Sequence, residues 1–259
     1  MFDEKTSQIL KSYVYLLVDP ETEEPFYVGK GKENRVFAHI NQDIKEGTEN
    51  LKYQEIQRIG SKKVKHVIVR HGLSELVAFA VEASLIDTFR YIPSFNKFAK
   101  GNIQGGINSI EKGLMTSNEI ISIYNAALLN SIDDNCLIIN INKNYKRGAG
   151  VEAIYNATKE TWKMAEWRPN KYKYVLSEYG GLIREVFEVE KWYTKERPDK
   201  HGKLYLGYGF NGKVAETEVR NKYLNKSIKG IKPQGYGSPT IYPEKLREWI
   251  NKELGRMSN

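Results

Sequence analysis

Cysteine and histidine are scarce in this chain of 259 residues, which has one cysteine, Cys136, and four histidines. A single thiol excludes a disulfide framework and any zinc site built from several cysteines, and it favours a reducing compartment. The longest apolar run, residues 76–86, is interrupted by Glu82 and is too short to span a membrane. The N-terminus lacks a basic region followed by an apolar one, so we expect no secretory signal and a cytoplasmic location.

Signatures of several enzyme classes are also missing. The chain has no Gly-x-Ser-x-Gly elbow, no P-loop and no dinucleotide fingerprint. Its few, scattered histidines cannot supply the cluster of ligands that a zinc or His-Asn-His nuclease site needs. These absences exclude the corresponding enzyme classes and leave charge distribution and other residue patterns as the guides to function.

Positive charge is concentrated in the last part of the chain. The formal net charge is +8, and residues 144–259 hold 23 Lys and Arg against 14 Asp and Glu, whereas residues 1–100 hold 15 against 14. Clustered cations gain free energy when they displace counterions from phosphates. A polyanionic partner is thus one reading, and a solvated lysine-rich surface is the other. The 17 tyrosines favour the first, because bases stack on aromatic rings.

Short apolar runs and turn signals predict an α+β module at the N-terminal end. Strands are predicted over residues 13–18, 25–29 and 66–69, with helices from near Asn34 and from the N-cap Ser74 to residue 89. This is a three-stranded antiparallel sheet flanked by helices. We assign residues 1–110 to this domain, 111–143 to a helical linker region and 144–259 to a basic domain.

The basic domain is predicted to be mixed α/β. Strands are expected over residues 137–141, 172–178, 182–192 and 203–210, and Gly180-Gly181 indicates a hairpin. Helices are expected over residues 118–129, 151–164, 214–223 and 243–254, the last opened by a first-turn proline.

Unusual polar residues recur within the first hundred positions. Tyr13-Val14-Tyr15 and Tyr27-Val28-Gly29 lie on neighbouring predicted strands, eleven residues apart. Arg35 and His39 share a helix face, Glu82 lies in an apolar helix, and Asn96 follows that helix. Taken singly, each has an ordinary explanation in packing or surface exposure.

Together these residues resemble the paired signature of the GIY-YIG nuclease superfamily over residues 11–106. The stretch Phe26 to Lys32, with Arg35 and His39, is most similar to the LEM-type branch. The pattern departs from the usual one at Tyr13, which stands where a glycine is common. The resemblance implies a nuclease that hydrolyses phosphodiester bonds.

It also implies roles for individual residues. Glu82 would hold a single Mg²⁺ or Mn²⁺ as Lewis acid, and Arg35 would stabilise the transition state. Tyr15 is the preferred base, and Tyr27 would position the water or the phosphate. The remaining members are Lys30 and His39, which would lower the pKa of Tyr15 or relay its proton, and Asn96, which would orient substrate or hold its loop.

A vaguer resemblance links the basic domain to PUA-like barrels of the ASCH and EVE group, which hold a flipped base. Aromatic residues that would line such a pocket are Trp162, Trp167, Tyr179 and Trp192, although tryptophans in strands are often core. Candidate phosphate contacts are Lys32, Lys171, Lys173, Arg184, Lys226, Lys229 and Lys232.

The resulting hypothesis is a Mg²⁺-dependent DNA endonuclease of restriction type whose basic domain selects the DNA, with dependence on base modification as one option. One alternative is a structure-specific repair or mobile-element nuclease, or an RNase, since RNA is not excluded as a substrate. The other is a nucleic-acid-binding protein with an inert nuclease module. No membrane partner is expected. The protein would be a monomer in solution or a transient dimer on DNA, because one metal site per chain implies two cutting events.

Overall fold

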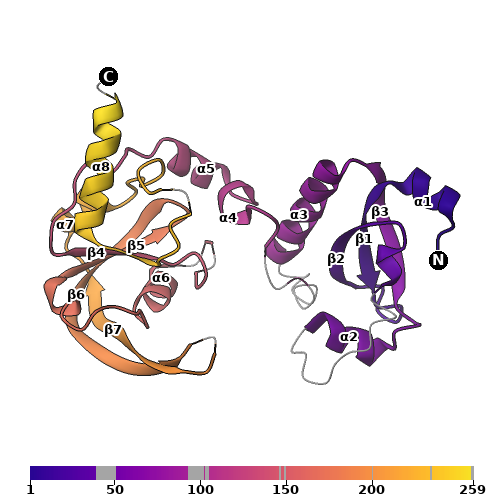
Figure 1. Ribbon diagram of the computed structural model, residues 1–259, viewed down its shortest axis with the longest axis horizontal. Helices are drawn as coiled ribbons and strands as arrows, with labels where there is room; N and C mark the ends of the chain where they lie inside the picture. The colour runs from indigo at the N-terminus through magenta and orange to yellow at the C-terminus, as the bar shows by residue number, and fades with distance from the viewer. Residues whose placement is uncertain are drawn as a thin grey trace. The chain divides into compact units, whose positions relative to one another are not determined.

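The computed structural model describes residues 1–38, 51–92, 102, 105–145, 147–148, 150–199, 201–233 and 235–257. The chain divides into two compact units, residues 1–115 and 116–259 (Figure 1). Among the residues described, no helix has both the length and the apolar character needed to cross a bilayer.

The first unit is built on a three-stranded antiparallel sheet, as predicted, and its strand order is β2-β1-β3. Its strands are β1 (Ser12–Val18), β2 (Pro25–Lys32) and β3 (Lys65–Leu73). Its helices are α1 (Glu4–Leu10), the short 3₁₀ helix η1 (Arg35–Phe37), α2 (Leu51–Ile59), α3 (Glu75–Tyr91) and α4 (Ser109–Lys112).

Side-chain alternation along β1 divides the core of this unit between the two faces of the sheet. Tyr13, Tyr15 and Leu17 are buried on the face that packs against α2. Val14 and Leu16 pack on the opposite face, against α3. Since successive residues of a strand point to opposite faces, this alternation fixes which side chains can meet.

Two local features of the first unit differ from the prediction. The helix expected from Asn34 is only the single turn η1 within the described residues, and residues 39–50 lie outside them. The helix α2 was not predicted, because its inward face places Lys52 in line with Ile56 and Ile59 and so weakens the amphipathic pattern.

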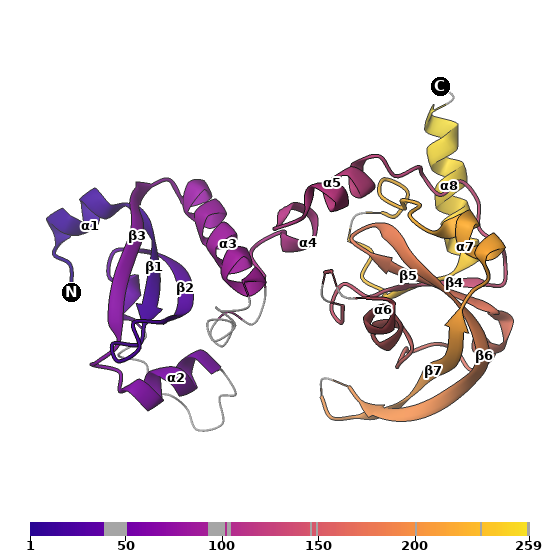
Figure 2. The same ribbon diagram turned by 180° about the vertical axis from the view of Figure 1, so that it is seen from behind.

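The second unit contains a five-stranded mixed sheet in the order β7-β6-β5-β4-β8, which curls into a half-barrel (Figure 2). β4 and β5 are parallel and the other pairs are antiparallel. The strands are β4 (Cys136–Asn140), β5 (Tyr174–Tyr179), β6 (Leu182–Pro198), β7 (Leu204–Val214) and β8 (Thr240–Ile241). The helices are α5 (Ser117–Tyr124), α6 (Val151–Thr158), η3 (Pro169–Lys171), α7 (Thr217–Tyr223) and α8 (Pro243–Met257). The mixed α+β class predicted for the chain is confirmed.

Part of the region interpreted as a linker belongs to this sheet. β4 lies between β5 and β8, and Leu137, Ile138 and Ile139 are fully buried. A strand that is apolar on both sides is stable only inside a covered sheet, which explains its position. The second unit therefore begins before residue 144.

Candidate active site

Two tyrosine rings meet over a glycine on the α2 face of the first sheet. The ring centroids of Tyr15 and Tyr27 lie 6.2 Å apart, and Tyr15 pairs with Gly29 in the β1–β2 register. A Cβ atom at Gly29 would lie 2.8 Å from the Tyr15 hydroxyl oxygen and 2.7 Å from Cε1 of Tyr27. The missing side chain thus allows both phenols to lie across β2.

Glu82, from α3, binds the backbone of the same strand, β2. Its Oε1 accepts a hydrogen bond from the backbone N–H of Lys30 at 2.8 Å. Burial raises the pKa of this half-buried carboxyl, whereas the Lys30 N–H opposes the shift. The negative charge of Glu82 in turn raises the pKa values of Tyr15 and Tyr27, in addition to the larger effect of their burial. The carboxylate and the two phenols therefore form one electrostatic cluster.

Asn102 holds the neighbouring part of the β2 edge. Its Oδ1 accepts from the N–H of Val28 at 2.8 Å, and its Nδ2 donates to the Val28 carbonyl at 2.9 Å. Sequence reasoning placed the post-helical asparagine at Asn96, which lies outside the described residues together with His39. Within the described residues, Asn102 is the asparagine that binds the β2 edge, and sequence reasoning missed it.

Arg35 reaches the cluster from η1. Its positive charge lowers the pKa values of Tyr15 and Tyr27, in opposition to their burial. Arg35 is exposed, and within the described part of the chain its guanidinium forms no ion pair. A guanidinium so placed is available to an anionic ligand.

Tyr13, the tyrosine at the usual glycine position, supports the turn that carries Arg35. Its hydroxyl donates to the Glu33 carbonyl at 2.8 Å and accepts from the buried N–H of Val36 at 3.1 Å. Its ring lies against Gly31, where a Cβ atom would be 3.0 Å from ring carbons. The tyrosine that stands at the usual glycine position thus stabilises η1 through two hydrogen bonds.

We expect Tyr13→Phe to destabilise the first unit by about 1–3 kcal/mol, because it leaves the buried Val36 N–H without its acceptor. Urea unfolding measures the change. Tyr91→Phe is the matched control, since Tyr91 lies in the same unit with a 62% exposed side chain. Equal unfolding midpoints for the two variants would contradict the bracing role of Tyr13.

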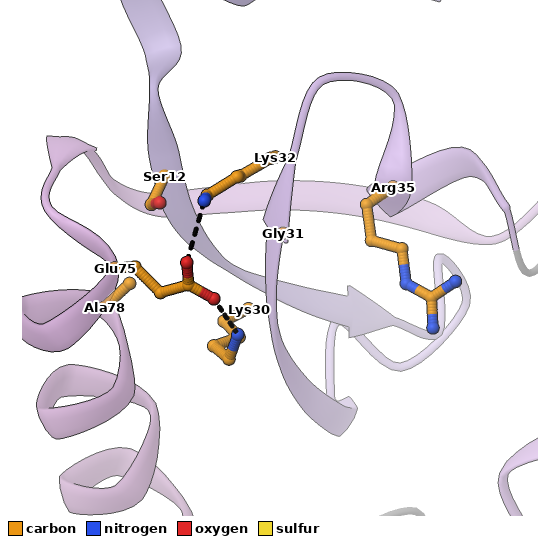
Figure 3. Close-up of a pocket in the computed structure, with 7 residues that line it drawn as sticks. All are labelled: Ser12, Lys30, Gly31, Lys32, Arg35, Glu75 and Ala78. Atoms are coloured by element: carbon orange, nitrogen blue, oxygen red, sulfur yellow. Dashed lines mark hydrogen bonds and ion pairs between the residues drawn. The ribbon is translucent and has the colours of Figure 1, made fainter.

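Lys30 and Lys32 lie on the other face of β2. The Lys30 ammonium is 3.3 Å from Oε1 of Glu75, and that of Lys32 is 2.8 Å from Oε2 of the same carboxylate (Figure 3). The Lys30 ammonium also lies 3.8 Å from the ring centroid of Phe79. The two lysines and Glu75 line a pocket of about 270 Å³ together with Ser12, Gly31, Arg35 and Ala78. Val28 and Lys30 of β2 face α3 rather than the tyrosines, so the Lys30 ammonium does not contact the phenol that it was expected to activate.

The lysine that meets a tyrosine of the cluster is Lys52, on α2. Its ammonium lies 4.7 Å from the ring centroid of Tyr27 and 4.4 Å from that of Tyr53. Burial lowers the pKa of Lys52, and the charge of Arg35 lowers it further. Sequence reasoning missed this residue. The sequence signal for it was the spacing of Lys52, Ile56 and Ile59, at i, i+4 and i+7, which puts the lysine on the inward face of the helix.

The donor set fits a hydrated divalent cation. No group of three His, Cys, Asp or Glu side chains gathers anywhere in the described ranges. Glu82 offers one carboxylate, of which one oxygen is bonded to Lys30 N–H. Mg²⁺ prefers such hard oxygen donors and retains several waters, so a single carboxylate suffices when phosphate oxygens are also present.

In the second unit, two of the predicted tryptophans are structural. Trp162 is 7% exposed, and its Nε1 donates to the Thr158 carbonyl at 2.6 Å. Trp192 is half-buried, donates to the Tyr172 carbonyl at 3.1 Å and packs on Phe210. Their indole N–H groups are already satisfied, as is usual for buried tryptophan.

The predicted basic residues separate to opposite ends of β5. Lys171 and Lys173 precede this strand, and Lys173 pairs with Glu188 at 3.3 Å. At the other end, beside the Gly180-Gly181 turn, lie half-buried Arg184, Lys226, Lys229 and Lys232. The candidates therefore do not form one continuous contact surface.

Trp167 has a different environment from the other tryptophans. Its side chain is 55% exposed, with the Arg168 guanidinium 4.7 Å and the Lys171 ammonium 4.4 Å from its ring. Arg168 also lies 3.7 Å from the Tyr242 ring and pairs with Glu244. Arg168 was not among the predicted contacts.

Comparison with known protein families settles the resemblance of the first unit. The family model described as LEM-3-like GIY-YIG domain matches residues 12–145. The chain belongs to the LEM-3-like GIY-YIG family. GIY-YIG domains are nuclease domains, which makes nucleic acid the expected substrate class. No curated protein and no solved structure matches the chain. The LEM-3-like GIY-YIG match continues past the first unit and includes α5 and β4, beyond the residues 11–106 that the motifs covered.

Proposed function

We propose that this protein is a metal-dependent endonuclease that hydrolyses phosphodiester bonds in DNA. The observation that carries the proposal is the meeting of Tyr15 and Tyr27 over Gly29, in a chain of a nuclease family. The charges of Arg35 and Glu82 act on both phenols. Two phenols, a guanidinium and a carboxylate supply proton transfer, anion stabilisation and a cation ligand at one strand edge.

Arg35 would donate hydrogen bonds to the non-bridging oxygens as charge builds up on the phosphate. Tyr15 would hold the attacking water and accept its proton, while Tyr27 fixes the position of the water or the phosphate. Burial keeps the pKa of Tyr15 above its ordinary value, so the resting phenol is protonated. To accept the water's proton, the Tyr15 phenol must first lose its own proton to solvent, and cationic neighbours in the substrate complex would stabilise the resulting phenolate.

Glu82 would hold the Mg²⁺ or Mn²⁺ ion, which when bound supplies Lewis-acid stabilisation of the phosphate and the leaving oxygen. The Lys30 N–H fixes the orientation of the carboxylate, leaving its second oxygen for coordination.

Purified full-length protein tests this assignment with Mg²⁺ or Mn²⁺ on unmodified duplex DNA, cytosine-modified duplex DNA and RNA. We expect DNA cleavage that a chelator abolishes. Preference for modified DNA would support the modification-dependent restriction role. Cleavage of RNA alone would favour the RNase alternative, and DNA binding without cleavage of any substrate would favour an inert module.

We propose further that the second unit selects the DNA through the surface formed by Trp167, Arg168 and Lys171. An exposed indole between two cations is suited to stack on a base while the cations contact adjacent phosphates. The excess of positive charge in residues 144–259 favours the same partner.

Trp167→Ala is expected to weaken DNA binding by about 1–3 kcal/mol, the free energy of one base–aromatic stack. Fluorescence anisotropy with labelled DNA, in the absence of divalent metal, measures binding without cleavage. The control is Tyr124→Ala, an aromatic residue of the same unit with a 71% exposed side chain. Unchanged DNA affinity in Trp167→Ala would show that this surface is not part of the DNA interface.

A further inference from the structure

We propose that Lys52 is a positioning residue of the active site, whose ammonium group holds the Tyr27 ring and places a second fixed positive charge beside Arg35. The inference rests on the proposed phosphodiesterase activity. It assigns to α2 the cationic role that sequence reasoning gave to Lys30.

The faces of β2 decide between the two lysines. Lys30 points toward α3 and pairs with Glu75, whereas Tyr27 points toward α2. Lys52 lies 4.7 Å from the Tyr27 ring centroid, within the range in which a cation is attracted to an aromatic face. Its side chain is only 8% exposed, so water screens this attraction poorly.

The position of Lys52 carries an electrostatic cost that a structural residue would avoid. Burial and the nearby charge of Arg35 both disfavour its ammonium form, as the lowered pKa shows. An apolar side chain would continue the inward face formed by Ile56 and Ile59 without that cost. Two cations held near one another are stabilised when an anion binds beside them.

A phosphodiester supplies that anion. Its negative charge increases in the transition state, so fixed cations nearby stabilise the transition state more than the bound substrate. Lys52 would act through the orientation of Tyr27 and through its charge, while Arg35 makes the direct contact. We therefore expect removal of the Lys52 charge to lower kcat more than it raises KM.

Three variants of the full chain test this role. Lys52→Met keeps the length of the side chain and removes the charge, and Lys52→Arg keeps the charge. Lys62→Met is the control, because Lys62 is an exposed lysine of the same unit with the same loss of net charge. Cleavage kinetics on DNA with Mg²⁺ and thermal unfolding are measured for each.

We expect Lys52→Met to lower kcat by up to about 100-fold, the loss that follows a small displacement of a reacting group. Its unfolding temperature should be unchanged or higher, and Lys52→Arg should recover most of the activity. Wild-type kcat in Lys52→Met, or a loss of activity that only accompanies a lower unfolding temperature, would overturn the proposal. Wild-type protein that cleaves nothing would instead overturn the proposed function, so the two failures are distinguishable.

Discussion

Glu82→Gln is expected to lower the DNA cleavage rate by about 10³-fold while the protein remains folded. Stabilisation of phosphate charge by a bound divalent cation amounts to several kcal/mol, and each 1.4 kcal/mol or so corresponds to a tenfold change in rate. Glutamine is nearly isosteric, and its carbonyl oxygen can still accept the Lys30 N–H. Replacing a half-buried carboxyl with a raised pKa also removes a charge that burial disfavours.

Single-turnover cleavage with Mg²⁺, together with thermal unfolding, measures both parts of this prediction. Glu111→Gln is the matched control, since Glu111 is an exposed glutamate of the same unit. Cleavage at the wild-type rate in Glu82→Gln would falsify the assignment of Glu82 as the metal ligand. A lower unfolding temperature than that of Glu111→Gln would show instead that the carboxylate stabilises the β2 edge.

The fold of the first unit was accessible from sequence because its elements obey local rules. The apolar run of β1 and the Ser74 cap of α3 both appear in the structure. The resemblance to the GIY-YIG superfamily, carried by short motifs in the first unit, is confirmed. The predicted catalytic roles of Tyr15, Arg35 and Glu82 stay predictions, although the structure brings the three side chains into one cluster.

Contacts between distant segments were less accessible. Lys30 and Tyr27 are three residues apart in one strand, which alone would have placed their side chains on different faces of the sheet. No local sequence feature indicates that Lys52 of α2 lies beside the Tyr27 ring. The same limit applies to Trp162 and Trp167, which are five residues apart, one buried and hydrogen-bonded and the other exposed between cations. The sequence pattern shows where aromatic residues occur, but tertiary packing decides whether each one is buried or exposed.

Gly29→Ala is expected to lower kcat by about 10²-fold with little change in DNA affinity. The added Cβ would lie 2.8 Å from the Tyr15 hydroxyl and 2.7 Å from the Tyr27 ring, so both phenols must move by roughly 1 Å, a displacement that costs about this much in rate. Overpacking should also destabilise the unit by about 1–3 kcal/mol. The atoms nearest this Cβ all belong to Tyr15 and Tyr27, so we expect Arg35 and Glu82, which are proposed to meet the phosphate and the cation, to stay in place.

This separation of binding from catalysis makes Gly29→Ala informative about the tyrosines themselves. Gly150→Ala is the control, because its Cβ would meet no atom within 4 Å. Both variants should be assayed below the unfolding temperature of Gly29→Ala, with DNA binding measured in parallel by anisotropy. If Gly29→Ala retains wild-type kcat, the phenol positions across β2 are irrelevant to the reaction and Tyr15 is not the base. If its kcat falls while its affinity for DNA is unchanged, the chemistry depends on the space that the missing side chain of Gly29 leaves for the two phenols.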